Sequence, residues 1–236
     1  MWNSNMTIIG STDVATSLLE ASNLIVLTES SIIHSNANLG VRGQGFLNLT
    51  GRGDLIEAQR LSLSLFYSIN VGPGSVLRSP LLNAPKDEMA PRLNCELQDC
   101  PTELIHPPED CNVNSSLSFT LQICRVEDIG VAGLVQGTVI HFHMARTVVV
   151  HLSGTISSSS LGCKGGVGRG TLSSSSGVGG GGGYGGKGGN GFFKGTSVKG
   201  GITYGNAALP CHLGSGSGND SMRASTAGGG IIGNIK

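Results

Sequence analysis

The residues of this sequence that are best suited to chemistry are its six cysteines, because a thiol can form a disulfide, bind a metal or act as a nucleophile. They are Cys95, Cys100, Cys111, Cys124, Cys163 and Cys211. We interpret all six as disulfide cysteines, although spacing alone does not fix the pairing. Two bridges among the first four and a Cys163–Cys211 bridge around the glycine-rich segment are one arrangement. The neighbouring residues Cys211 and His212 also permit a Cys–His nucleophile, but adjacency in sequence is weak support for a working pair.

Two histidines at alternate positions raise the possibility of a metal site. His141 and His143 flank Phe142, so both side chains would leave a strand on the same face. Zinc needs a third protein ligand, and His151 is the nearest histidine along the chain. Histidines with a purely structural role on a strand face are far commoner than such a site. We therefore predict no metal-binding residues and no cofactor.

Two acidic pairs raise the possibility of glycan cleavage, because glycan-cleaving enzymes use two spaced carboxyl groups. The pairs Asp87-Glu88 and Glu109-Asp110 both fall in a proline-rich segment, where a rigid acid–base arrangement is difficult to hold. The chain also lacks the GxSxG pattern of a nucleophile elbow. We predict no catalytic residues.

Two short motifs have simpler explanations than ligand binding. Gly181, Gly186 and Lys187 match the spacing of a phosphate-binding loop, but Gly188 stands where Ser or Thr would meet magnesium. Such spacing arises by chance in a run of glycines. The Arg52–Asp54 tripeptide spells the RGD adhesion motif, and it also has the composition of an ordinary turn.

N-glycosylation is a further candidate modification. The motif Asn-x-Ser/Thr occurs at four positions, which are Asn5, Asn48, Asn114 and Asn219. A chain this rich in serine and threonine would carry about three such motifs by chance. The four motifs give only weak support for secretion.

The overall composition excludes several classes of protein. The 236 residues include 39 glycines, and 15 basic residues balance 15 acidic ones. A neutral chain with 4% aromatic residues does not fit nucleic-acid binding, which requires a basic surface and often stacking aromatics. No apolar stretch is long enough to form a transmembrane segment, and the first residues do not resemble a secretory signal.

The chemistry-bearing residues must be positioned by strands, because short β-branched and apolar runs separated by Asn and Gly dominate residues 1–79 and 115–161. The run LSLSLFYSI (61–69) alternates apolar and polar residues like a half-buried strand. Residues 13–23 fit one or two helical turns or a loop. The segment 80–114 holds six of the eight prolines and three of the cysteines, so we interpret it as an insertion.

The last segment, 162–236, holds 27 of the 39 glycines. A glycine run buries little apolar surface and loses much backbone entropy on folding. We expect a flexible glycine-rich loop followed by incomplete β-rungs. Short strands with Asn and Gly at the corners favour a mainly β chain built as a right-handed parallel β-helix. A β-sandwich is the alternative.

The sequence resembles the large plant glycine-rich proteins of unknown function. The resemblance covers most of residues 10–230 and is carried by VATSLLEASNLIVL, SSIIHSNANLGVRGQG, IEAQRLSLSLFYSINVGPGSVLR, HPPEDCNVNSSLSFTLQICRVEDI, GCKGGVGRG, GGYGGKGG and ITYGNAALPCHLGSGSGND. Members of this family are similar to secreted or endomembrane proteins several times longer than this chain. The resemblance implies β-helical rungs and an internal fragment, and it supplies no catalytic residues.

These observations lead to one functional expectation and one alternative. We expect a non-enzymatic structural or binding protein of the plant secretory pathway, in contact with cell-wall polysaccharide or extracellular protein. It would be extracellular, vacuolar or membrane-anchored in the full-length protein, and cytoplasmic if Met1 is the true start. The alternative is a β-helical polysaccharide hydrolase or lyase.

Overall fold

The computed structural model describes residues 1–11, 16–81, 95, 100–112, 118–206, 208–218 and 227–235. The chain divides into two compact units. The β-helix unit comprises residues 1–91, 107–157 and 232–236, and the glycine-rich unit comprises residues 92–106 and 158–231.

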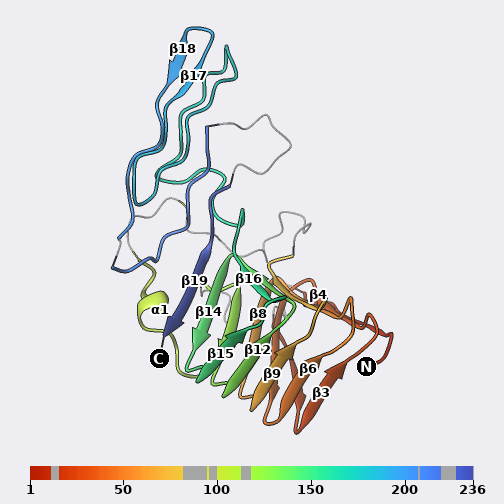
Figure 1. Cartoon of the computed structure of the whole chain (residues 1–236). Helices are drawn as coiled ribbons and strands as arrows, with labels where there is room; N and C mark the ends of the chain where they lie inside the picture. Colours follow the sequence, from red (N-terminus) through yellow and green to blue (C-terminus); the bar gives the residue numbers. More distant parts are fainter. Residues whose placement is uncertain are drawn as a thin grey trace. The chain divides into compact units, whose positions relative to one another are not determined.

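The β-helix unit is built from three parallel sheets (Figure 1). Sheet I contains β1 (Asn5–Ile8), β4 (Ile32–Ser35), β7 (Leu55–Glu57), β10 (Val76–Ser79), β13 (Leu134–Gly137) and β16 (Thr155–Ser157). Sheet II contains β2 (Thr16–Ala21), β5 (Asn38–Gly43), β8 (Arg60–Ser64), β11 (Leu121–Cys124), β14 (Val139–His143) and β19 (Ile231–Ile235). Sheet III contains β3 (Leu24–Leu27), β6 (Phe46–Leu49), β9 (Ser68–Val71), β12 (Asp128–Val131) and β15 (Thr147–Val150). The chain visits the three sheets in turn, one strand each per rung, which confirms the predicted parallel β-helix-like fold.

The core consists of aliphatic side chains stacked from rung to rung. In sheet I, Ile33 pairs with Ile56, and Leu77 lies between Ile56 and Val135. All four are fully buried. Burial of one such side chain contributes about 1.5–3 kcal/mol, so the inward-facing alternate residues of each strand hold the rungs together.

The residues at the corner between sheets II and III differ from the Asn and Gly that the sequence predicts for corners. Its left-handed residues in three successive rungs are Leu65, Arg125 and Met144, with φ of 65°, 53° and 51°. The corner at Leu65 divides the predicted run 61–69 into β8 and β9. Residues 13–23, for which the sequence allowed either helical turns or a loop, contain the strand β2 instead.

Both composition-biased segments leave the β-helix at the same corner, between sheet I and sheet II. Residues 80–120 connect β10 to β11, and residues 158–230 connect β16 to β19. In the intervening rung, Thr138 alone separates β13 from β14. The β-helix unit therefore continues across two long insertions, which together supply the glycine-rich unit.

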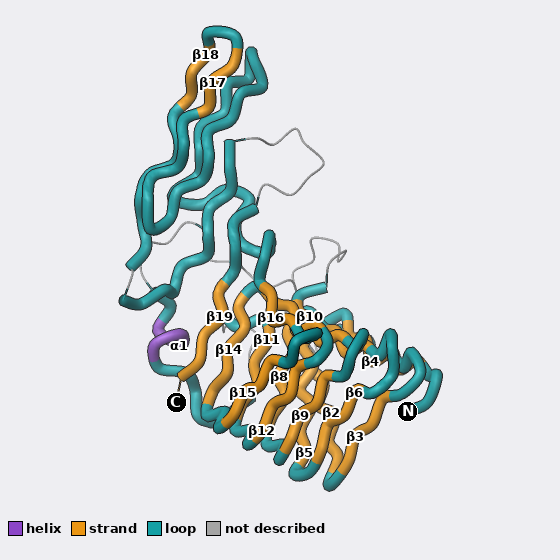
Figure 2. The backbone as a smooth tube through the Cα atoms, in the orientation of Figure 1, coloured by secondary structure: helices purple, strands orange, loops and turns teal. Residues whose placement is uncertain are grey.

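The glycine-rich unit contains little regular structure, namely the short helix α1 (Thr102–Ile105) and a hairpin of β17 (Gly191–Phe193) and β18 (Thr196–Val198). Its other segments run side by side and are drawn as loops in Figure 2. Backbone hydrogen bonds join them, for example Gly183 N–H to Gly168 O at 2.7 Å and Gly188 N–H to Gly201 O at 2.9 Å.

The prediction of a flexible loop is therefore wrong for these glycines. Their segments pack against one another through the backbone. A Cβ atom on Gly201 would lie 1.7 Å from the carbonyl oxygen of Gly168. A Cβ atom on Gly170 would lie 2.1 Å from that of Gly180. As at the axis of collagen, only glycine fits where backbones approach so closely. The sequence reasoning missed this because it counted only apolar burial.

Candidate functional site

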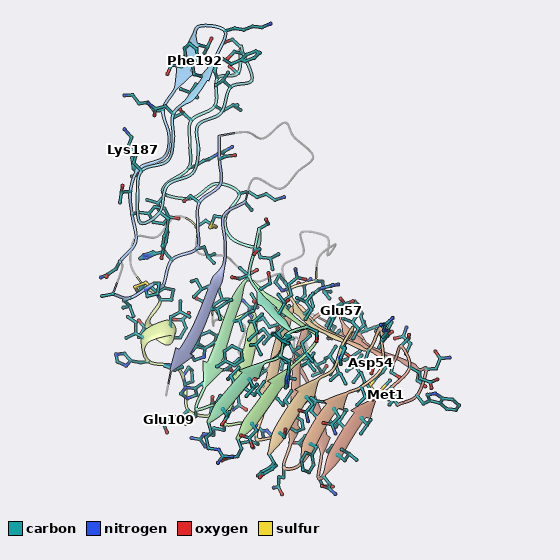
Figure 3. All side chains as sticks on the ribbon, in the orientation of Figure 1. Met1, Asp54, Glu57, Glu109, Lys187 and Phe192 are labelled. Carbon is teal, nitrogen blue, oxygen red and sulfur yellow. A yellow bond between two sulfur atoms is a disulfide. The ribbon has the colours of Figure 1, made fainter. Side chains whose placement is uncertain are left out.

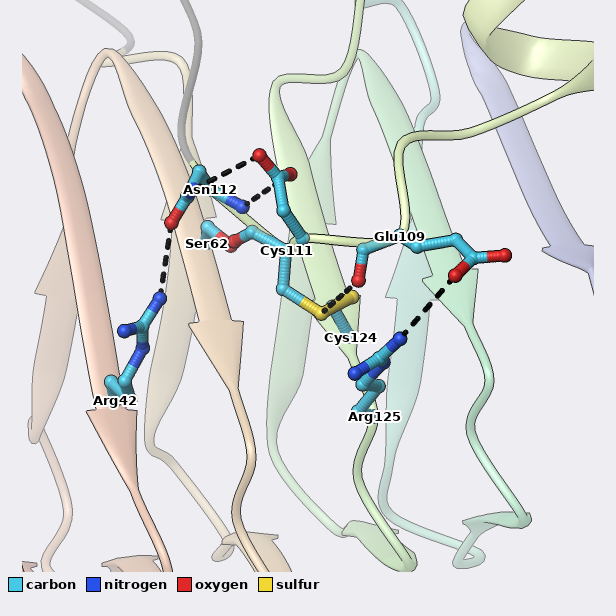
Figure 4. The surroundings of a disulfide bond; sticks show 8 residues. Arg42, Ser62, Glu109, Cys111, Asn112, Cys124 and Arg125 are labelled. Carbon is cyan, nitrogen blue, oxygen red and sulfur yellow. Dashed lines mark hydrogen bonds and ion pairs between the residues drawn. A yellow bond between two sulfur atoms is a disulfide. The ribbon is translucent and has the colours of Figure 1, made fainter.

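The outer face of sheet II is covered by a segment of the chain, shown in Figure 4. Cys111 forms a disulfide with Cys124 on β11, and its carbonyl oxygen accepts a hydrogen bond from Ser62 Oγ at 3.2 Å. Arg42 donates to Asn112 Oδ1 at 3.0 Å. Because the strands β8, β11 and β14 are buried along their whole length, this part of the face is closed to a macromolecular ligand.

His141 and His143 lie beneath this cover, next to each other on β14. The rings of Phe119 and His141 stack with centroids 4.4 Å apart. Both histidines are buried, and neither of their rings has a hydrogen-bond partner among the described residues. Burial, aided by His143, lowers the pKa of His141 to about 4. Burial also lowers the pKa of His143, and the positive charge of Arg125 adds to this effect.

The third histidine considered for a metal site lies elsewhere. His151 follows β15 at the end of sheet III, and its side chain is exposed. Its Nε2 atom lies close to Gly130 of sheet III. The structure thus brings His141 and His143 together and leaves His151 apart from them.

The outer face of sheet I carries a ladder of paired polar groups. His34 Nδ1 lies 2.9 Å from Glu57 Oε1, and Arg78 Nη1 lies 3.5 Å from Glu57 Oε2. Arg78 Nε also donates to Gln136 Oε1 at 3.2 Å. These half-buried groups satisfy one another across four strands, which indicates a structural role.

The outer face of sheet III is different, because it exposes aromatic rings. Phe46 begins β6 and Tyr67 precedes β9, and their side chains are 40% and 52% exposed. The two rings meet edge to face with centroids 5.7 Å apart. Leu24, the partner of Phe46 on β3, is also exposed. Large apolar side chains are therefore grouped at the N-terminal ends of β3, β6 and β9.

A row of amides lies beside the aromatic pair on the same face. Asn48 and Asn70 are register partners, and Asn70 Nδ2 donates to Asn48 Oδ1 at 2.9 Å. On the next strand, a Cβ atom on Gly130 would lie 2.9 Å from Asn70 Oδ1 and 3.7 Å from His151 Nε2. The missing side chain of Gly130 thus lets the exposed Asn70 amide and the exposed His151 imidazole both approach this strand.

The RGD tripeptide is part of a turn and not an exposed adhesion loop. The Asp54 side chain is 0% exposed. It accepts backbone hydrogen bonds from Ser31 at 3.0 Å, Thr50 at 3.1 Å and Gly51 at 2.6 Å. A carboxylate engaged in this way cannot reach a receptor-bound cation.

Of the two acidic pairs in the proline-rich segment, the structure describes Glu109-Asp110, and its two carboxylates bind different partners. Asp87 and Glu88 lie outside the described residues. Glu109 pairs with Arg125 at 3.8 Å. Its neighbour Asp110 instead accepts a hydrogen bond from the backbone of Asn112 at 3.1 Å.

The two glycines of the phosphate-loop spacing, Gly181 and Gly186, make backbone hydrogen bonds to other residues of the glycine-rich unit. Gly181 N–H donates to Gly189 O at 2.8 Å, so this amide does not point at a free anion site. Lys187 is followed by further glycine-rich segments. In the described part of residues 188–235 the chain forms strands and turns but no helix.

All six cysteines are in disulfides, as predicted, but the suggested arrangement is wrong: Cys163 and Cys211 do not pair, and only one bridge lies among the first four cysteines. The bridges are Cys95–Cys163, Cys100–Cys211 and Cys111–Cys124. The physical reason is the shared corner from which both insertions leave, since it carries Cys95 and Cys100 into the glycine-rich unit. Three disulfides indicate an oxidising environment, either extracellular or in the secretory pathway.

His212 lies next to one of these bridges. Its Nδ1 atom is 3.5 Å from the Sγ atom of Cys211, and Cys100 completes a cluster of the kind that binds metals. Because the thiolate is the reactive form for both metal binding and nucleophilic attack, the disulfide removes both possibilities from this cluster.

The predicted glycosylation sites differ in setting. Asn5 is exposed on β1, whereas the half-buried Asn48 belongs to the amide row. Asn114 and Asn219 lie outside the described residues. Among the residues that the structure describes, no helix is long and apolar enough to cross a membrane.

Comparison with known proteins adds no assignment: no family model, curated protein or solved structure matches this chain.

Proposed function

We propose that this chain is a non-enzymatic glycan-contact protein of the plant secretory pathway or cell wall, and that the outer face of sheet III holds the polysaccharide. The observation that carries the proposal is the exposed Phe46–Tyr67 pair beside the Asn48–Asn70 amide row. The three disulfides support a location in which such a ligand would be present.

The chemistry of this face suits a sugar chain. Aromatic rings pack against the apolar C–H faces of pyranose rings, and amides can both donate hydrogen bonds to hydroxyl groups and accept them. Parallel strands repeat every ~4.8 Å across a sheet, which is close to the length of one pyranose unit in an extended polysaccharide. Successive rungs can therefore contact successive sugars.

The other two faces support this choice by contrast. The groups of the sheet I ladder already bind one another, from His34 to Gln136. In sheet II, the outer face of β8 and β11 lies under the segment that contains Cys111. Sheet III is the face on which aromatic and amide groups are exposed together.

A contact role also fits the acidic residues near sheet III better than catalysis does. Glu127 and Asp128 both pair with Arg146, at 2.8 Å and 3.1 Å. A glycosidase needs one carboxyl group to donate a proton and a second to act as a nucleophile or base. Two carboxylates held by one guanidinium are poorly placed for that division of roles.

The proposal is tested by affinity electrophoresis of the full disulfide-bonded chain through gels containing xyloglucan, xylan, mannan or polygalacturonate. We expect retardation by at least one of these polysaccharides. Tyr67→Ala should weaken this retardation by about 10-fold or more, as expected for loss of a central aromatic contact. Phe192→Ala is a matched control, because it removes an exposed ring outside sheet III.

Two outcomes would count against the proposal. Retardation that Tyr67→Ala leaves unchanged would exclude sheet III as the contact surface. Release of reducing or unsaturated sugars by the purified chain would instead support the hydrolase or lyase alternative.

A further inference from the structure

The glycine-rich unit has an uneven charge that the neutral chain as a whole conceals. Residues 158–218 contain no Asp or Glu and five basic residues. The basic residues are Lys164, Arg169, Lys187, Lys194 and Lys199. A positive segment of this kind attracts an anionic partner.

The apolar counterpart of this charge is the hairpin of β17 and β18. Phe192 and Phe193 are 75% and 52% exposed, and Phe192 is marked at the end of the unit in Figure 3. Consecutive strand residues point to opposite faces, so the two rings leave the hairpin on different sides. Lys194 lies in the turn, with its Nζ atom 5.3 Å from the centre of the Phe193 ring.

A second hairpin lies next to the first. Leu172 and Gly179 form an antiparallel bridge, and Leu172 is exposed. A Cβ atom on Gly191 would lie only 2.9 Å from Val178 Cγ1, so the two hairpins are in contact. The end of the glycine-rich unit thus presents exposed apolar side chains from two hairpins beside basic ones.

We propose that this end, formed by residues 171–180 and 191–199, is an interfacial anchor that inserts into an anionic lipid surface. Two phenyl rings on opposite faces of a thin hairpin cannot both lie on one flat partner. Both are buried when the hairpin enters the boundary between lipid headgroups and acyl chains. Lys199, which follows β18 at the base of the hairpin, then lies at the level of the phosphates, where its charge strengthens attachment.

This inference goes beyond glycan contact and does not depend on it. An acidic polysaccharide such as polygalacturonate would also attract the cations. Such a polysaccharide would, however, bind through the basic side chains and would not require both phenyl rings. The role of Phe192 and Phe193 therefore separates the two partners.

The test is co-sedimentation of the full oxidised chain with vesicles of phosphatidylcholine, with and without phosphatidylserine. We expect binding to the vesicles with phosphatidylserine, and weaker binding as salt increases. Phe192→Ala and Phe193→Ala should each lower the partition coefficient by about 10-fold. Lys199→Gln should lower binding only where phosphatidylserine is present.

Ile202→Ala and Leu18→Ala are matched controls, since each removes an exposed apolar side chain outside the two hairpins. Both should bind vesicles like the unaltered chain. Absence of vesicle binding would overturn the proposal. Binding that both phenylalanine variants retain, or retention by polygalacturonate alone, would also overturn it and assign the charge to a polyanion.

Discussion

The Oδ1 atom of Asp54 accepts a hydrogen bond of 3.0 Å from the backbone N–H of Ser31, which lies one rung earlier in the β-helix. The other carboxylate oxygen binds the N–H groups of Thr50 and Gly51. Ser75 continues the same corner, where its hydroxyl donates to the carbonyl of Gly51 at 3.0 Å. The RGD tripeptide, which matches an adhesion motif in the sequence, thus provides hydrogen bonds that join neighbouring rungs.

Replacing Asp54 by alanine should lower the free energy of unfolding by about 3 kcal/mol. The change leaves buried backbone N–H groups without acceptors, and each hydrogen bond to a charged group contributes roughly 1.5–3 kcal/mol. Urea unfolding of both proteins measures the difference. The exposed neighbour Arg52 provides the control, since Arg52→Ala should change stability by less than about 0.5 kcal/mol. Equal effects of the two substitutions would contradict the structural role of Asp54.

The buried His141 should make stability depend on pH. Burial places its folded-state pKa at about 4, below the ordinary 6.5. Between these values the unfolded chain binds the proton more tightly. The free energy of unfolding is therefore full above pH 6.5 and falls as the pH drops toward 4, by up to about 3 kcal/mol.

Urea titrations at a series of pH values test this dependence. His141→Phe keeps an aromatic ring against Phe119 and should make the profile less steep, and His143, whose pKa burial also lowers, should account for the slope that remains. Val149→Phe adds a ring at an exposed position and removes no histidine, so it should leave the slope as it is. A His141→Phe profile as steep as that of the unaltered chain would show that other groups cause the pH dependence.

The left-handed corner offers a stabilising substitution. Met144 holds a φ of 51°, a conformation that costs a residue with a side chain about 1–2 kcal/mol. Met144→Gly should therefore raise the free energy of unfolding by roughly 0.5–1 kcal/mol, after the entropy lost on ordering glycine. Thr147→Gly, at an exposed strand position, should lower it by a similar amount. Thermal unfolding distinguishes the two signs.

Two glycines test whether the glycine-rich unit is packed through its backbone. A Cβ atom on Gly201 would lie 1.7 Å from Gly168 O, whereas Gly186 has nothing within 4 Å of that position. Gly201→Ala should disrupt the unit, which limited proteolysis would detect as faster cleavage within residues 158–218. Gly186→Ala should be cleaved at the original rate. Similar rates for the two variants would indicate a loop without packed segments.

Much of the β-helix could be predicted from sequence because its signals are local. Alternation in residues 61–69 and the short apolar runs reflect side chains that point in and out of one strand. The left-handed conformation of Leu65 could not be predicted in this way, because leucine has no preference for a positive φ. Its conformation is set by the rungs stacked on either side.

The candidate site and the disulfide pairing could not be predicted from the sequence, because both depend on contacts between residues far apart in the chain. Phe46 and Tyr67 become neighbours only through the register between β6 and β9. Cys95 and Cys163 are 68 residues apart. They meet because the two insertions share a corner, which composition does not reveal. The cysteines themselves were identifiable, but their partners were not.

The most direct test of the account is a comparison of polysaccharide binding by two double variants of the full oxidised chain. Phe46→Ala/Tyr67→Ala removes the rings of sheet III, and His34→Ala/Gln136→Ala changes the ends of the sheet I ladder. We predict that the first variant loses retardation in affinity gels by more than about 10-fold and that the second keeps it. If the sheet III variant binds as the unaltered chain does, sheet III is not the glycan-contact face.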